Sequence, residues 1–144
     1  MSVTRAALLL YVEGEHAGLL AEAGIVVADT QAGVKSILDK AFRAVGVAQA
    51  DLPTATTDAT NSEKLEAAAD YYTYDRLARI FARWVSISKG AGGASASRDR
   101  SKIYTQVVAE RDRMQAICAD LGLIVSVADS RVFTINLDFL EPAL

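Results

Sequence analysis

The sequence has 144 residues, of which 51% are hydrophobic and 23% charged, with two prolines and nine glycines. These values are typical of a single globular domain, 1–144, and they exclude a collagen-like, low-complexity or wholly disordered chain. The formal net charge of −3 conceals an asymmetry, because residues 76–102 carry +6 whereas residues 1–75 carry −6 and residues 103–144 carry −3.

The inventory of reactive side chains is small. One cysteine, Cys118, excludes an intramolecular disulfide, and together with the single His16 it excludes a zinc site of three or four such ligands. No apolar run approaches the roughly 18 to 20 residues that cross a bilayer, and Glu13 and Glu15 interrupt any signal-peptide core. We therefore expect a protein made in the cytoplasm that has no membrane partner, metal or cofactor.

The first segment, residues 1–29, has the weakest periodicity. Apolar residues recur in it at roughly helical spacing from about Thr4, but Gly14 and Gly18 each lower the helix propensity. The next segment, residues 30–46, has a clear apolar face, with Thr30 as a candidate cap and Gly46 as a stop. This pattern predicts a helix over residues 31–45.

Residues 47–60 show no periodicity, contain Pro53 and are interpreted as an extended loop. Two long helical patterns follow within residues 61–122. The first begins near residue 62, where Thr60 and Glu63 have capping-box spacing, and it reaches about Lys89. The second runs from about residue 97 to 121 and ends before Gly122. The short glycine-rich connection between them predicts an antiparallel helical hairpin.

The last segment, residues 123–144, changes from helical spacing to alternation. Apolar side chains occupy every second position of its second strand, and such a strand pair needs a partner surface to cover it. We therefore interpret this segment as a β-rich docking tail, with four candidate docking residues: Phe133, Ile135, Leu137 and Phe139. The expected fold is mainly α, a helical bundle built on the long hairpin, with a short C-terminal β-hairpin or strand tail.

No local signature of phosphate, dinucleotide, acyl-transfer or zinc chemistry occurs in the sequence. The glycine-rich stretch after Lys89 follows a helix and not a strand, so it indicates a helix connector. His16 is interpreted as a surface or capping histidine, and Cys118 as a small core hydrophobe. The sequence thus predicts no catalytic residue and no enzyme activity.

The basic block is the strongest chemical signal. Three of its arginines, at steps of three and four, share one side of the first long helix, and further basic residues follow across the connection. Such a cluster is a solvated face, or it contacts phosphates or an acidic protein surface. The candidate contact residues are Arg76, Arg79, Arg83, Arg98, Arg100 and Lys102.

The order of these parts resembles a known family. The string from Leu38 to Gly46, a polar loop, the segment from Leu65 to Tyr72 and the Gly/Ser stretch from Lys89 to Ser97 are similar to tailed-bacteriophage head-to-tail adaptor proteins, also called connectors or head-completion proteins. The resemblance covers about residues 30–122. It leaves out the first 28 residues and the strand that holds Phe133.

The resemblance implies a structural protein of the virion, without catalysis. Such a protein forms a homo-oligomeric ring, expected to be a dodecamer, that binds the portal of the phage head. It hands the DNA channel on to the next neck, stopper or tail-terminator protein, so that DNA passes through it transiently. The basic residues would then contact acidic portal residues or the DNA channel.

Two other classes of function compete with this one. A cytosolic helical regulator or interaction module would bind nucleic acid or an acidic partner through the basic hairpin tip, with salt-dependent affinity. A small helical enzyme would need a pocket of perturbed titratable groups, and the candidates, His16 with Glu13, Glu15 or Glu22, are clustered only in sequence.

Overall fold

The computed structural model describes residues 2–90, 94–123 and 125. For residues 86–90 and 94–99 it describes the helical backbone and not the side chains. The described chain is mainly helical, as expected from the sequence. Its elements in chain order are β1 (Ser2–Thr4), α1 (Arg5–Glu22), α2 (Ala32–Ala44), the 3-10 helix η1 (Gln49–Thr54), β2 (Thr56–Asp58), the 3-10 helix η2 (Ala59–Asn61), α3 (Ser62–Gly90) and α4 (Ala94–Asp120).

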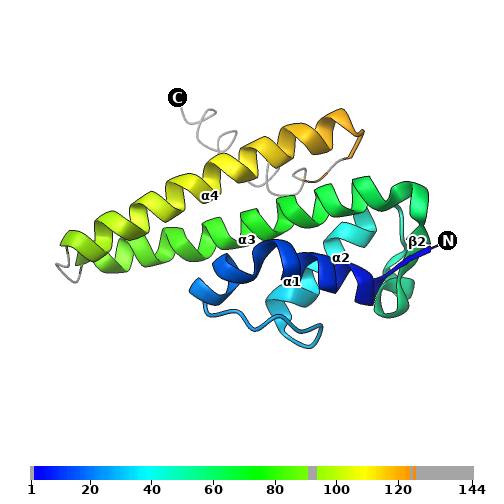
Figure 1. Cartoon of the computed structure of the whole chain (residues 1–144), viewed down its shortest axis with the longest axis horizontal. Coiled ribbons are helices and arrows are strands. Elements are labelled where there is room, and N and C mark those ends of the chain that lie inside the picture. The colour runs from blue at the N-terminus through cyan, green and yellow to red at the C-terminus, as the bar shows by residue number, and fades with distance from the viewer. Residues whose placement is uncertain (1, 91–93, 124, 126–144) are drawn as a thin grey trace, which may run out of the picture.

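The long helix α3 runs through the middle of the molecule. Figure 1 shows α4 lying along one side of it, whereas α1 and α2 cover the other side. The α3–α4 pair extends beyond the ends of α1 and α2, and β1 and β2 lie at the opposite end of the molecule. Within the described residues, each helix is too short, or too polar in its most apolar stretch, to serve as a membrane span.

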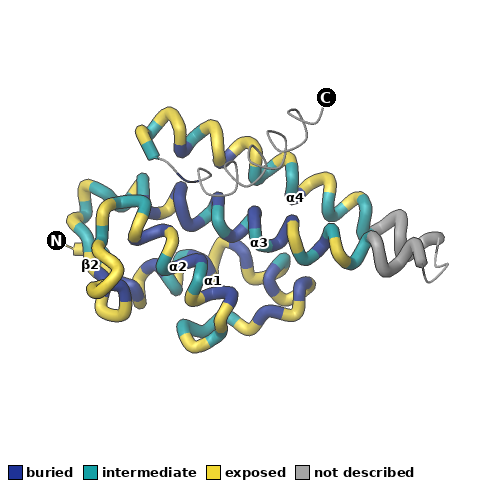
Figure 2. Tube along the Cα trace, turned by 180° about the vertical axis from the view of Figure 1, so that it is seen from behind, coloured by how far each residue is buried: buried dark blue, intermediate teal, exposed yellow. Residues whose placement is uncertain are grey.

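The core lies where α3 meets its neighbours. Phe42 of α2 and Phe81 of α3 are fully buried, and Figure 2 shows buried positions along the inner faces of the helices. The small residues Ala67, Ala68 and Ala69 of α3 are all buried, which allows neighbouring backbones to approach this turn closely. Thr73 is buried without penalty, because its hydroxyl donates to the carbonyl of Ala69 at 2.7 Å.

Helix α1 forms despite its two glycines, because packing outweighs propensity. Leu8, Val12, His16 and Leu20 stand four residues apart and are all buried. A side chain at Gly14 or Gly18 would point into open space, so these glycines serve no packing contact.

The ends of the helices follow local chemistry. The hydroxyl of Thr4 accepts the amide of Ala7 and caps α1. Gly46 and Gly122, the stops expected from the sequence, have φ angles of 96° and 79°, a left-handed conformation that terminates α2 and α4.

The segment 47–60 is not the extended loop expected from the sequence. It contains η1, β2 and η2, and β2 pairs antiparallel with β1 through Ser2–Asp58, Val3–Thr57 and Thr4–Thr56. Leu52 and Ala55 of this segment are buried in the core. Strands of three residues are too short to show alternation, and their pairing depends on contacts distant in sequence.

The chain after α4 is described only at its beginning. Leu123 donates its amide to the carbonyl of Cys118, and the buried Val125 accepts a hydrogen bond of 2.7 Å from the hydroxyl of Tyr72. The expected strands of the tail, including Phe133, Ile135, Leu137 and Phe139, lie outside the described residues.

Cys118 is a fully buried member of the core, as its apolar neighbours suggested. Burial, with a smaller contribution from Asp70, raises the pKa of its thiol from 9.0 to about 11. At pH 8 the folded chain should therefore react with iodoacetamide at least about a hundredfold more slowly than the urea-unfolded chain, since only the thiolate reacts. Mass spectrometry of timed samples measures both rates, and similar rates would contradict a buried thiol.

Candidate functional site

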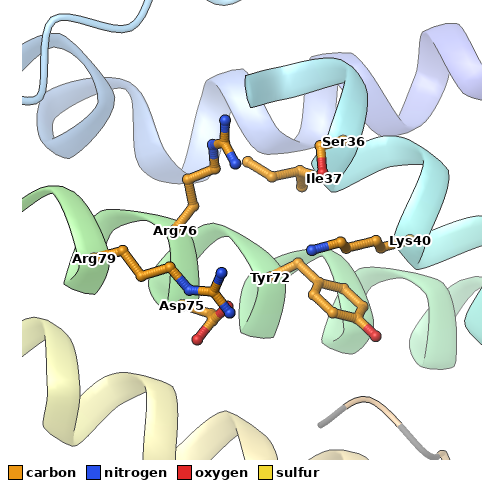
Figure 3. A pocket seen from close by; sticks show the side chains of 7 residues that line it. All are labelled: Ser36, Ile37, Lys40, Tyr72, Asp75, Arg76 and Arg79. Atoms are coloured by element: carbon orange, nitrogen blue, oxygen red, sulfur yellow. The ribbon is translucent and has the colours of Figure 1, made fainter. Parts of the chain in front are cut away.

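A small pocket lies between α2 and α3 and gathers basic side chains from both helices. It encloses about 230 Å³ of empty space, part of which is open to solvent. The interior has room for little more than one water molecule, far less than the roughly 300 to 1,000 Å³ of sites that take a whole small molecule. Its lining residues are Ser36, Ile37, Lys40, Tyr72, Asp75, Arg76 and Arg79 (Figure 3).

Arg76 reaches from α3 toward α2 beside Ser36 and Ile37 (Figure 3). Its path depends on Gly33 in the first turn of α2: a Cβ atom at Gly33 would lie 2.8 Å from Nε of Arg76. The absence of a side chain at Gly33 thus leaves the space in which the guanidinium lies. A Cβ there would displace the flexible head of Arg76 and leave the backbone in place.

The other two cations have different surroundings. Arg79 forms an ion pair of 3.0 Å with Asp75, whose carboxylate is buried, one turn earlier on α3. Lys40 reaches across from α2, and its ammonium lies 5.6 Å from the ring centroid of Tyr72. Because the hydroxyl of Tyr72 binds Val125, the ring that supports Lys40 is itself held in place.

The pocket has an excess of positive charge. Three basic groups line it, together with one carboxylate, Asp75, which pairs with Arg79. Among the described residues, neither Lys40 nor Arg76 has a carboxylate within salt-bridge distance. Positive groups that exceed the carboxylates beside a helix interface favour binding of an anion.

The remaining candidates of the basic block lie elsewhere. Arg83 and Lys102 are exposed, and Arg100 packs its guanidinium 5.6 Å from the ring centroid of Trp84. The side chain of Arg98 lies outside the described part of the chain. The structure therefore brings Arg76 and Arg79 together with a residue of another helix, Lys40.

A second polar cluster is buried between α1 and α3. The carboxylate of Asp70 accepts a hydrogen bond of 2.7 Å from Nε2 of His16 and another of 2.8 Å from the hydroxyl of Tyr11. The ring of Tyr74 stands edge-on to His16, with centroids 5.0 Å apart. Burial and then Asp70 raise the pKa of Tyr11, which remains a neutral donor.

The interpretation of His16 as a surface histidine is wrong, because only 4% of the residue is exposed. Glu13, Glu15 and Glu22, the acids considered as its partners, are exposed on other faces of α1. Nδ1 of His16 has no hydrogen-bond partner among the described residues. The described residues bring no nucleophile into hydrogen-bond contact with His16, so this cluster joins two helices.

Arg5 forms the third polar centre. It donates to Asp29 at 2.8 Å, to Asp39 at 2.6 Å and to the carbonyl of Leu52 at 3.1 Å. The hydrogen bond to Asp29, more than any other cause, raises the pKa of Arg5. Although an open groove passes over it, Arg5 is already neutralised by two carboxylates and is not free to bind a further anion.

Sequence reasoning identified Arg76 and Arg79 but missed Lys40, Ser36 and Gly33. These three stand on one face of α2 at steps of three and four, yet nothing in the sequence indicates that this face meets Arg76. His16 did leave a signal, since it shares the four-residue spacing of Leu8, Val12 and Leu20.

The described side chains provide no group of three histidine, cysteine, aspartate or glutamate residues that could hold a metal ion. The site that emerges from the geometry is thus a small cationic pocket on a helical scaffold. Comparison of the chain with known protein families, with curated proteins and with solved structures finds no match.

Proposed function

We propose that this protein is a structural component of a tailed-phage virion, an adaptor that assembles as a ring between the portal of the head and the next neck or tail protein. The observation that supports the proposal is the α3–α4 pair, which extends beyond the other helices and carries exposed basic side chains such as Arg83 and Lys102. A rigid arm of this kind suits contact with a neighbouring ring. The role needs binding surfaces and no catalytic residue.

The proposal includes the finer arrangement expected from the sequence. The α3–α4 pair would act as a long helical hairpin, and residues 123–144 would form the strand tail that docks on a neighbour. The ring would be a dodecamer with the DNA channel along its axis. The hairpin and the ring follow the resemblance over residues 30–122, whereas the tail is argued from the alternation of apolar residues alone.

The direct test is assembly. Purified protein, alone at high concentration and mixed with the portal protein of the same phage, should form rings visible by negative-stain electron microscopy, because lateral contacts are favoured by mass action and by a template. A chain that stays monomeric and never binds portal would contradict the adaptor role. Salt-dependent binding of duplex DNA by a monomer or dimer would favour the regulator instead.

A pair of truncations tests the tail. Removal of residues 126–144 should leave the melting temperature nearly unchanged and abolish ring or portal binding. Removal of residues 123–144 should also lower the free energy of unfolding by about 1 to 2 kcal/mol, because it deletes the buried Val125 and its hydrogen bond to Tyr72. Loss of folding when only residues 126–144 are removed would show that the tail belongs to the core.

A further inference from the structure

We propose that the pocket between α2 and α3 is a receptor for one carboxylate group of a protein partner, with Arg76 and Lys40 as its binding residues. The inference rests on the proposed function, since an adaptor must hold a protein partner, and it defines the chemistry of that contact. Neither the basic stretch of the sequence nor the resemblance includes Lys40 as a contact residue.

The size of the pocket limits the ligand to a single small group. Its interior has room for little more than one water molecule, so only the terminal oxygen atoms of an anionic group can enter from the open mouth, and the remainder of the ligand must stay outside. Phosphates of a DNA duplex are continuous along its backbone and are normally met by rows of exposed cations. Arg76 is instead half-buried between two helices.

The charge arrangement favours a single negative charge. Asp75 is buried in the pocket and pairs with Arg79, whereas the described residues place no carboxylate within salt-bridge distance of Lys40 or Arg76. A dianionic phosphate would be repelled by the Asp75 carboxylate more strongly than a carboxylate would. On a protein, the group that fits is the side chain of aspartate or glutamate, which matches the planar guanidinium of Arg76.

The geometry also shows what positions Arg76. Gly33 has no side chain, and the guanidinium occupies the place where a Cβ would lie. The φ angle of Gly33 is not positive, so alanine fits the helix there. The added Cβ would also lie 3.0 Å from Oε1 of Gln31, which caps α2. The substitution Gly33→Ala therefore shifts the head of Arg76 and this capping oxygen without changing any charge, which distinguishes a shaped pocket from a general basic surface.

The experiment is a nuclear magnetic resonance titration of the full chain. The probes are a blocked alanine peptide that carries one glutamate, the same peptide with glutamine, inorganic phosphate and a short DNA duplex. The glutamate peptide should shift the Nε–H resonance of Arg76 and bind at least about tenfold more tightly than the glutamine peptide. Equal affinity of the two peptides would overturn the proposal, as would tighter binding of phosphate at Arg76.

Three variants complete the test. Gly33→Ala and Arg76→Gln should each weaken the glutamate peptide at least about tenfold. Arg83→Gln is the matched control, because it removes the same charge from the same side of α3, outside the pocket. If Arg83→Gln weakens binding of the glutamate peptide as much as Arg76→Gln does, or if binding of the duplex depends on both arginines, the basic residues form an extended surface and the pocket proposal is wrong.

The two proposals can fail separately. If the glutamate peptide binds as described but the protein forms no rings and ignores portal, the adaptor role fails and the pocket stands. If rings form with portal and the peptide probes do not bind at Arg76, the pocket fails and the adaptor role stands. Circular dichroism melting of each variant confirms that the fold is intact.

Discussion

Replacing Arg5 by methionine should lower the free energy of unfolding by about 3 kcal/mol. Arg5 is 6% exposed, and its guanidinium joins two carboxylates and two backbone carbonyls from three separate parts of the chain. Methionine would fill much of the volume but would leave Asp29 and Asp39 close together without their cation. Removal of one partner from a buried ion pair costs several kcal/mol, and the partial exposure of both aspartates reduces that cost here.

Urea unfolding followed by circular dichroism measures this loss. Arg5→Lys should recover only part of the stability, because one ammonium cannot reproduce the fork that binds both aspartates. Arg113→Met provides the control, since Arg113 is exposed and pairs with Glu110 on the surface of α4. Solvent screens a surface pair of that kind, so Arg113→Met should lower the free energy of unfolding far less than Arg5→Met does. Equal losses at Arg5 and Arg113 would contradict a central role for Arg5.

Replacing Asp70 by alanine should also cost about 3 kcal/mol. The change leaves Nε2 of His16 and the hydroxyl of Tyr11 without their acceptor at the α1–α3 contact. Each unpaired buried polar group costs about 1 to 3 kcal/mol, which exceeds the net value of the hydrogen bond that formed there. Tyr11→Phe removes only one donor and should cost about 1 kcal/mol.

A double-mutant cycle sharpens this prediction. The loss from Tyr11→Phe should nearly vanish when Asp70 is already alanine, because the two changes remove the same hydrogen bond. Asp112→Ala is the control for the Asp70 variant, since Asp112 is exposed and, among the residues that the structure describes, forms an ion pair only with its neighbour Arg111. If the two losses add in full, the hydrogen bond between Tyr11 and Asp70 contributes nothing to stability.

The helices could be predicted from the sequence because their signals are local. The expected helices at 31–45 and from residue 62 to 89 correspond to Ala32–Ala44 and Ser62–Gly90, and Gly46 ends the first as expected. Apolar spacing and caps act within a few residues, so one segment carries the whole signal. The strand pair of Ser2–Thr4 with Thr56–Asp58 could not be found in this way, since neither strand carries a pattern.

Only some residues of the pocket could be predicted, because contacts between distant segments leave no local pattern in the sequence. Arg76 and Arg79 share a side of one helix, which the spacing indicates. That Lys40 and Gly33 lie opposite them follows from how α2 packs on α3, a contact fixed by the buried side chains of both helices. His16 shows the reverse case, in which the spacing was informative but the usual preference of histidine for partly exposed positions led to the wrong interpretation.

The pairing of β1 with β2 also affects how the chain folds during synthesis. Ser2–Thr4 leave the ribosome before Thr56–Asp58, and the carbonyl of Leu52 that Arg5 binds is made almost as late. At about 5 to 20 residues per second, roughly 50 residues take several seconds. During that time β1 lacks its partner β2, and the apolar side of α1, with Leu8 and Val12, lacks α3 to cover it. Chaperones that hold nascent apolar segments therefore have a defined interval, and a defined helix, on which to act.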